Sequence, residues 1–445
     1  AASDVYKRQG YVVPARPKRN GKKIAVIGAG PSGLSVAVRL NARGYEVTIF
    51  DSKPMPGGLL RYGIPNFKLP KEVIDRRMDV LKAEGIRFEM SVPIDVRKLP
   101  AGFDAYAVCT GTPAARDLVI PGRELKGIYF ALDMLTQQNR ILDGETFPKE
   151  QLVNAKGKRV LVIGGGAVGL EFATMYAGFG SHVTLLEAGN RFLPKVDRDI
   201  AASMLEALNR KRINVRLNAR VQSVYDTAEG ITLTYTDSAN GTPYYLKGDA
   251  LLVAIGRKPM TAELNLEKAG IQTDKRGAIV VDNQLRTTAP HVWALGDVKG
   301  DEQFDYLSID DFRIIRNQLF ENKKRSTKDR YPIPFAIFTD PPLAHIGLTE
   351  EEAMKNGYSI HVARIPAAMI PRARTLHSID GMLKAIVDIH TGRILGCTLL
   401  CADAPEVINT VASIMKTGQR YHFLRDFIFT HPSMNEGLNM LFKPF

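Results

Sequence analysis

The sequence predicts an α/β fold with two Rossmann-like dinucleotide-binding domains followed by a C-terminal α+β domain. Two complete glycine-rich βαβ fingerprints, which begin near residues 23 and 159, carry the first part of this prediction. A change of pattern after a proline-rich segment at residues 331–334 carries the second part. The length of 445 residues agrees with three domains of about 150 residues each.

The first fingerprint joins a short apolar strand, residues 23–27, to an amphipathic helix through Gly28, Gly30 and Gly33. Gly28 and Gly30 permit a tight turn and close approach of the backbone to a pyrophosphate, and Gly33 lets helix and strand pack. The next apolar run ends at Asp51. That carboxylate is placed to accept a hydrogen bond from a ribose hydroxyl.

The second fingerprint repeats this plan with Gly164, Gly166 and Gly169, and its closing acid is Glu187. In both copies the acid falls 18 residues after the third glycine. One isolated match would be weak evidence, but two complete copies in strand–turn–helix context predict that the chain binds two dinucleotides.

Three further apolar runs end at glycines, as expected where a chain leaves a parallel sheet over a bound nucleotide. They are residues 105–111, which end at Thr110 and Gly111, residues 250–256, which end at Gly256, and residues 292–297, which end at Gly296 and Asp297.

The pattern after residue 331 is that of an α+β domain. We expect strands at 383–389 and 393–400 and helices at 349–356 and 405–417. The predicted organisation is a basic leader over 1–20, a first nucleotide domain from 21–113 and 258–330, a second over 114–257, and an interface domain over 331–445.

Nearly half of the net charge of +13 comes from residues 1–23, which carry seven bases and one acid. The other basic cluster, at residues 323–330, lacks interleaved aromatic side chains, so nucleic acid is not an expected partner. No uncharged apolar run approaches the roughly 18 residues that cross a bilayer, and the leader lacks a signal-peptide core. We therefore expect a cytoplasmic protein without a membrane partner.

Together these motifs resemble the flavoproteins with two dinucleotide-binding domains. The supporting residues are the Thr-Gly pair at 110–111, the A-x-G-R-x-P run at 254–259 and the A-L-G-D run at 294–297. The resemblance implies that the first fingerprint holds FAD and the second holds NAD(P)H. It also implies that Asp297 bonds the ribityl chain of the flavin.

Residues 10–155 resemble the small subunit of glutamate synthase, on the runs 57–70, 73–77, 120–127 and 130–139. In those relatives the residues that correspond to Gly57, Gly58 and Leu59 line FAD, and the base that corresponds to Lys68 approaches it. The cysteine-rich iron-sulfur module of that family is absent from this sequence.

Residues 158–445 resemble instead the pyridine nucleotide-disulfide reductases, close to the subgroup linked to reactive-chlorine resistance. The matching runs are 193–200, 325–327, 338–342, 347–350, 370–374 and 429–436. The resemblance implies a homodimer in which His431, oriented by Glu436, serves as acid-base in the partner subunit, and it places Glu171 near flavin and nicotinamide. The alternatives are an interface role for His431 and a solvated helix position for Glu171.

The sequence departs from the disulfide reductases at their redox centre. That family carries a C-x4-C pair just after the first βαβ unit, where this chain has residues 57–70 with no cysteine. Cys397 and Cys401, if on one strand, would lie about 13 Å apart, beyond the roughly 7 Å limit for a disulfide. We expect them and Cys109 to be packing residues, and we expect no metal site. A natural recombination and an artificial join of two reading frames both account for the change of resemblance near residue 156.

The leading functional hypothesis is an FAD-dependent, diaphorase-like oxidoreductase that passes electrons from NAD(P)H to an unidentified small-molecule or protein acceptor. Glu187 favours NADH over NADPH, because a carboxylate 4 Å from a 2′-phosphate costs about 4 kcal/mol per charge at an effective dielectric of 20. Arg191 is close enough in sequence to offset this repulsion. The alternatives are the electron-input subunit of a glutamate synthase-like complex, and a chimeric nucleotide-binding chain without productive acceptor chemistry.

Overall fold

The computed structural model describes residues 14–66, 68–95, 98–112, 114–228, 230–300, 302–321 and 325–445. Most of the predicted leader, residues 1–13, and the lysines Lys323 and Lys324 of the basic cluster lie outside the described residues. The chain divides into two compact units. The first unit comprises Ala1–Arg116, Leu132–Val153 and Arg257–Asp329, and the second comprises Asp117–Ala131, Asn154–Gly256 and Arg330–Phe445.

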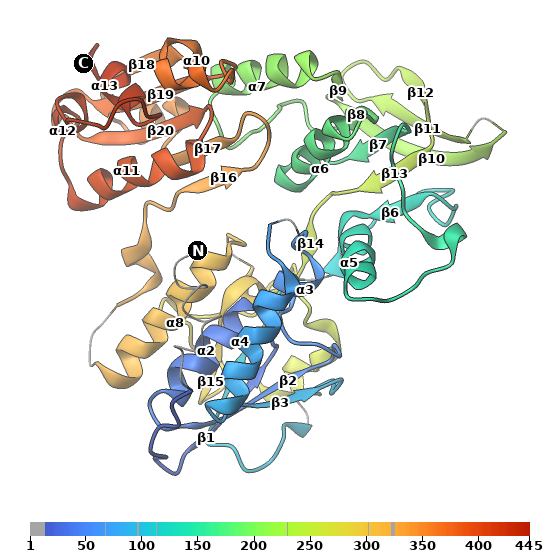
Figure 1. The fold of residues 1–445 in the computed structure, drawn as a ribbon, viewed down its shortest axis with the longest axis vertical. Coiled ribbons are helices and arrows are strands. Elements are labelled where there is room, and N and C mark those ends of the chain that lie inside the picture. The colour runs from blue at the N-terminus through green and yellow to red at the C-terminus, as the bar shows by residue number, and fades with distance from the viewer. Residues whose placement is uncertain are drawn as a thin grey trace. The chain divides into compact units, whose positions relative to one another are not determined.

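The first unit is built on a five-stranded parallel sheet in the order β15-β4-β1-β2-β3 (Figure 1). Its central strands are apolar and buried, as is typical of a parallel sheet covered on both faces. The strands are β1 (Lys23–Ile27), β2 (Glu46–Asp51), β3 (Arg87–Met90), β4 (Ala105–Val108) and β15 (Val292–Ala294). Because β1 and β4 are parallel neighbours, their carboxyl ends meet at one edge of the sheet.

Helices of the first unit come from three separate stretches of sequence. The glycine loop leads directly into α2, which packs beside α8. The helices are α2 (Pro31–Asn41), α3 (Leu59–Tyr62), α4 (Lys71–Ala83), α5 (Ala131–Leu142) and α8 (Asp305–Phe320), and a two-stranded sheet joins β5 (Ala114–Ala115) to β14 (Arg257–Lys258). All of α5 after Ala131 clusters with this unit.

The second unit contains a matching five-stranded parallel sheet and two antiparallel sheets. The parallel sheet has the order β6-β13-β7-β8-β9, and a three-stranded sheet, β10-β11-β12, accompanies it. The elements are β6 (Ile128–Phe130), β7 (Arg159–Ile163), α6 (Ala167–Gly178), β8 (His182–Leu186), α7 (Arg198–Arg210), β9 (Ile213–Arg216), β10 (Ala219–Thr227), β11 (Gly230–Asp237), β12 (Pro243–Gly248) and β13 (Ala250–Val253).

The C-terminal part of the second unit is an antiparallel sheet in the order β16-β17-β20-β19-β18. The two predicted strands and two predicted helices are present within one residue of their expected ends. The elements are β16 (Phe335–Ile337), β17 (Leu343–Gly347), α9 (Glu350–Lys355), β18 (Ile360–Pro366), α10 (Pro371–Thr375), β19 (Met382–Asp388), β20 (Ile394–Leu400), α11 (Ala404–Thr417), α12 (His422–Arg425) and α13 (Glu436–Phe442). The predicted fold class is confirmed.

A buried lysine ties α7 to this C-terminal sheet. The Nζ of Lys384, on the central part of β19, is 2.9 Å from Asp199, 3.0 Å from Glu350 and 3.2 Å from Asp197. Its side chain is only 1% exposed. Such a charge is tolerated inside a protein when it is paired on several sides. Among the described residues no helix is long and apolar enough to cross a membrane.

Candidate functional site

The turn after β1 holds the first glycine fingerprint in a conformation that only glycine accepts. Gly28 has φ +110°, and a Cβ built on it would lie 2.4 Å from the carbonyl oxygen of Cys109 at the end of β4. A Cβ on Gly33 would lie 1.9 Å from the carbonyl oxygen of Gly28. These glycines let α2 start directly against the sheet, so that its amide groups face the carboxyl end of β1.

The acid that closes this fingerprint is fixed by the backbone. Oδ2 of Asp51 accepts a hydrogen bond of 2.7 Å from the amide of Ala29, and Oδ1 accepts one of 2.8 Å from the amide of Lys53. A carboxylate has about four lone-pair positions, so further acceptor capacity is available for a ribose hydroxyl.

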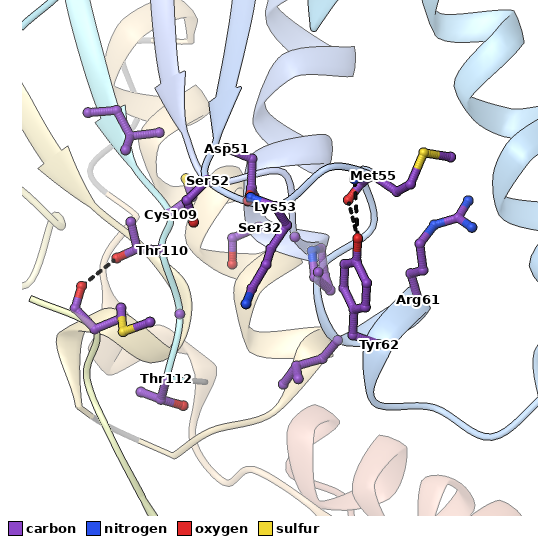
Figure 2. Close-up of a pocket in the computed structure, with 18 of the residues that line it drawn as sticks. Ser32, Asp51, Ser52, Lys53, Met55, Arg61, Tyr62, Cys109, Thr110 and Thr112 are labelled. Carbon is purple, nitrogen blue, oxygen red and sulfur yellow. Dashed lines mark hydrogen bonds between the residues drawn. The ribbon is translucent and has the colours of Figure 1, made fainter. Parts of the chain in front are cut away.

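A cavity of about 1080 Å³ opens around this turn, entirely within the first unit (Figure 2). Its size is at the upper end for small-molecule sites, as an extended dinucleotide requires. The predicted residues that line it are Gly28, Gly30, Asp51, Gly58, Leu59, Thr110, Gly111 and Asp297, whereas Gly33, Gly57 and Gly296 support its wall from behind and Lys68 is exposed elsewhere on the loop.

Asp297 is held at the cavity wall by a buried ion pair behind it. Its Oδ2 accepts from the hydroxyl of Thr112 at 3.1 Å. The amide of Gly296 donates to Asp311 at 2.7 Å, and Lys299 lies 3.5 Å from the same Asp311 oxygen. Both members of that pair are almost completely buried, so the turn that carries Asp297 is anchored to α8.

Two buried cations, Arg61 and Lys71, organise the segment that follows Gly57 and Gly58, and no local pattern predicts that they are buried. The guanidinium of Arg61, 2% exposed, donates to the carbonyl of Pro56 and pairs with Asp75 and Asp143. The ammonium of Lys71 donates to the carbonyls of Leu60, at 3.1 Å, and of two further loop residues. Burial lowers the pKa of Lys71. Hydrogen bonds from these two charged side chains therefore fix α3 and its loop, in addition to side-chain packing.

Helix α5 closes one side of the cavity, which the predicted boundary at residue 114 did not anticipate. The hydroxyl of Thr136 donates to the carbonyl of Tyr62 at 3.2 Å. Leu132, Asp133 and Arg140 line the cavity with it. Figure 2 shows Tyr62 beside Met55, to which its hydroxyl is hydrogen-bonded.

The second fingerprint, in the second unit, repeats the geometry of the first. Gly164 has φ +109°, and a Cβ on Gly169 would lie 1.8 Å from the carbonyl oxygen of Gly164. A Cβ on Gly166 would meet nothing within 4 Å, so its face is open to a ligand. Gly256, at the end of the neighbouring strand β13, has φ +109°.

The acid of the second fingerprint also accepts two backbone amides. The carboxylate of Glu187 accepts hydrogen bonds from the amides of Gly165 and Gly189, each at 2.7 Å. Arg191 is directed away from this acid, because its guanidinium donates to Glu351 at 3.1 Å and to the carbonyl of Val196 at 3.3 Å.

The three predicted catalytic residues lie in the second unit. His431 Nδ1 is 2.8 Å from Glu436 Oε1, and the His431 side chain is 68% exposed. The amide of Ser433, and then His431, hold the pKa of Glu436 below its usual range. Glu171 accepts a 3.0 Å hydrogen bond from the amide of Phe338, so its carboxylate holds the chain directly after β16 of the C-terminal sheet.

All three thiols are buried and free. Cys109, Cys397 and Cys401 are each at most 4% exposed. Burial raises the pKa of all three thiols, that of Cys401 to about 12. Thiolate chemistry at neutral pH is therefore suppressed at each. Within the described residues, no group of three or more His, Cys, Asp or Glu side chains is arranged to hold a metal ion.

The family profile described as "Pyridine nucleotide-disulphide oxidoreductase" matches residues 22–313, and the profile of that family's dimerisation domain matches residues 333–441. The chain belongs to the pyridine nucleotide-disulphide oxidoreductase family. It is accordingly an oxidoreductase of a family that binds FAD and uses pyridine nucleotides, and it carries that family's dimerisation domain.

Several members of the family are similar over different lengths. The probable pyridine nucleotide-disulfide oxidoreductase RclA of Escherichia coli is 49% identical over 282 residues, which is 63% of each chain. Dihydrolipoyl dehydrogenase of Thermus scotoductus is 29% identical over 451 residues, covering 93% of this chain and 95% of that one. The solved structure of the HOCl-induced flavoprotein disulfide reductase RclA from E. coli in complex with Cu(II) superposes with a TM-score of 0.81 at 35% identity, covering 96% of this chain and 99% of that one.

The first unit fits the flavin that the family carries. The glycines at 28 and 33 have no room for a Cβ, the cavity has the size of a large nucleotide, and Asp51 has spare acceptor capacity. These are observations on this chain, and they agree with the family assignment.

Proposed function

We propose that this protein is an FAD-dependent oxidoreductase that takes hydride from NADH and passes the electrons to an acceptor without a protein dithiol. The observation that supports it best is a nucleotide cavity at the first fingerprint, lined by Gly58, Leu59 and Tyr62, together with the absence of cysteine from residues 57–70 of the sequence. Cys109, just after β4, lines the cavity but is buried with a raised thiol pKa, and Cys397 and Cys401 are buried within the second unit.

In this proposal the residues of the first unit would hold FAD, whose flavin ring would supply the hydride-accepting chemistry. Gly28, Gly30 and the N-terminus of α2 hold the pyrophosphate, and Asp51 holds a ribose. Thr110 and Gly111 cover the nucleotide, and Asp297 orients the ribityl chain. Gly58 and Leu59 line the flavin end of the cavity. Gly57, Gly296 and Lys68 do not line it, and we propose that they shape the loops that carry the lining residues.

The preference for NADH rests on Glu187. Gly164, Gly166, Gly169 and Gly256 form the second nucleotide turn, and the charge of Glu187 disfavours a 2′-phosphate. Arg191 pairs with Glu351 instead, which supports the preference.

The C-terminal domain is proposed to pair two identical chains. His431, oriented by Glu436, is then available at the surface for the partner, either as a proton donor and acceptor or as an interface residue. Glu171 is proposed as a positioning residue, because its carboxylate is engaged by a backbone amide.

Anaerobic titration with NADH tests the proposal. We expect a yellow protein whose flavin band bleaches with one equivalent of NADH, without the long-wavelength band of a thiolate–flavin pair. Thiols that react with an aromatic disulfide reagent should number the same before and after reduction, because no disulfide is opened. The gain of two reactive thiols per chain on reduction would refute the dithiol-free relay, and a protein that cannot be loaded with FAD would refute the flavin assignment.

A second candidate is the electron-input subunit of a glutamate synthase-like complex. It is supported by the resemblance of the runs 57–70, 73–77, 120–127 and 130–139 to the small subunit of that family. Stoichiometric binding to a glutamine-dependent large subunit, followed by NADH-driven reduction of its centres, would favour this candidate over a free-standing diaphorase.

A further inference from the structure

We propose that the flavin cavity selects its electron acceptor by charge, and that it admits cationic or neutral oxidants and repels anionic ones. The inference rests on the proposed function, because it concerns the second half-reaction at the same site. It restricts the possible electron acceptors from all small oxidants to those that are cationic or neutral.

The lining of the cavity is strongly acidic in a chain whose net charge is +13. Nine carboxylates and three cations line it, a formal excess of six negative charges. The acids are Asp51, Asp75, Asp95, Asp133, Asp143, Glu145, Glu263, Asp297 and Asp305, and the bases are Lys53, Arg61 and Arg140.

Partial protonation does not remove this excess. Burial, and then the charge of Asp297, raise the pKa of Asp305, while Arg257 opposes the shift. With Asp305 neutral, and with Arg257, which lies 3.6 Å from Asp297, counted beside the three lining bases, four negative charges remain in excess. The pyrophosphate of a bound FAD adds two more, so the loaded site is more negative than the cavity alone.

Three of the seven lining acids that are not assigned to the nucleotide lie on α5 or just after it. Asp133 is in the first turn of the helix, and Asp143 and Glu145 follow its end. Arg140 is neutralised by Glu145, whose oxygen lies 2.6 Å away, and Arg61 is buried between two carboxylates. Neither cation is therefore left as a net positive charge for an anionic acceptor.

The physical effect is electrostatic focusing. A concave site lined by one sign of charge raises the local concentration of ions of the opposite sign and lowers that of like ions. Asp133 and Glu145 are exposed to solvent, so they act on an oxidant before it reaches the flavin. The selection should weaken as salt shortens the Debye length from about 30 Å at 0.01 M to about 10 Å at 0.1 M.

A pair of outer-sphere oxidants of opposite charge tests the inference on the FAD-loaded protein. Hexaammineruthenium(III) is a trivalent cation and ferricyanide is a trivalent anion. Each takes one electron, so two ions reoxidise one two-electron-reduced flavin, which releases its proton to water. The protein is reduced with dithionite, excess reductant is removed, and flavin reoxidation is followed by stopped-flow absorbance as salt is raised.

We expect the rate constant for hexaammineruthenium(III) to fall at least tenfold between about 0.01 and 0.5 M salt, and the rate constant for ferricyanide to rise. The comparison uses only whether each rate constant rises or falls with salt. The two oxidants differ in reduction potential, but this difference does not change the direction of the salt effect. The opposite signs, or two salt-independent rates, would overturn the inference.

A pair of charge-neutralising substitutions locates the effect. Asp133→Asn with Glu145→Gln should slow the cation and speed the anion by about threefold for each charge removed. The matched control is Asp79→Asn. Asp79 is on α4 of the same unit, its side chain is 77% exposed, and it does not line the cavity. Equal effects of the control and the cavity variant would assign the selection to the protein's overall field and overturn the proposed site.

The use of dithionite keeps this test separate from the proposed function. Failure of NADH to bleach the flavin would refute the NADH-dependent reaction and leave the charge selection measurable. Bleaching by NADH with reversed salt dependences would refute the charge selection alone.

Discussion

The two glycine fingerprints have nearly the same backbone and quite different surroundings. Gly28 and Gly164 have φ of +110° and +109°. A Cβ on the third glycine would lie 1.9 Å from the carbonyl oxygen of the first glycine in one copy and 1.8 Å in the other. Asp51 and the acid of the second copy each accept a loop amide at 2.7 Å.

The difference begins after the closing acid. In the first unit, α3 and its loop are fixed by the buried Arg61 and Lys71, and α5 completes an acidic cavity. In the second unit Glu187 likewise accepts the amide two residues after it, as Asp51 accepts that of Lys53, but the chain then continues into α7. The shared backbone motif therefore identifies nucleotide binding, and the side chains that follow it determine what chemistry the nucleotide is placed to do.

The largest effect is expected from alanine at the third glycine of each fingerprint. Gly33→Ala forces a Cβ into the carbonyl of Gly28, and overpacking of this kind costs about 1–3 kcal/mol or more. We expect FAD affinity to fall by one to two orders of magnitude, measured as the ratio of flavin to protein absorbance. Gly169→Ala should leave a yellow protein whose reduction by NADH is slowed to a similar degree.

Gly178→Ala is the matched control, since a Cβ at this end of α6 meets nothing within 4 Å. It should retain both flavin content and NADH reduction. Loss of flavin in Gly169→Ala together with normal NADH reduction in Gly33→Ala would show that the two cofactors are assigned to the wrong fingerprints.

Much of the fold was predictable because local patterns encode it. The apolar run at 23–27, the glycines after it and the acid at Asp51 predict β1, the turn and β2 directly. The C-terminal strands followed from two apolar runs joined across the turn signal at Thr391 and Gly392. The family profiles confirm the predicted class of protein.

The arrangement around the cavity was not predictable, because it depends on contacts between distant residues. Thr136 and Tyr62 are 74 residues apart, and Arg61 and Asp143 are 82 apart. Lys71 has the local pattern of an exposed helix residue, yet its ammonium is buried against three carbonyls. Charge and periodicity alone give no indication that such a side chain is internal.

Changing the closing acids should have a smaller effect that again separates the two fingerprints. Asp51→Asn places an amide group opposite one of two backbone N–H donors, and an unmet donor costs about 1–3 kcal/mol. We expect FAD affinity to fall about tenfold. Glu187→Gln removes the repulsive charge and should lower the NADH-to-NADPH preference about tenfold, as a ratio of kcat/KM values. A change of coenzyme preference in Asp51→Asn would contradict the assignment.

The smallest effect is expected at Arg191, whose place in the sequence indicates that it could contact a 2′-phosphate. Its guanidinium is instead engaged by Glu351 and by the carbonyl of Val196. Arg191→Ala should therefore change the NADH-to-NADPH ratio less than twofold. Glu351→Gln is the informative partner variant, because it weakens the ion pair and leaves the guanidinium in place. If the pair restrains Arg191, this variant should improve NADPH use modestly while Arg191→Ala does not. A fivefold loss of NADPH activity in Arg191→Ala, with NADH unchanged, would show that the guanidinium leaves Glu351 to bind the coenzyme, and the preference would then depend on a competition between Glu187 and Arg191 rather than on Glu187 alone.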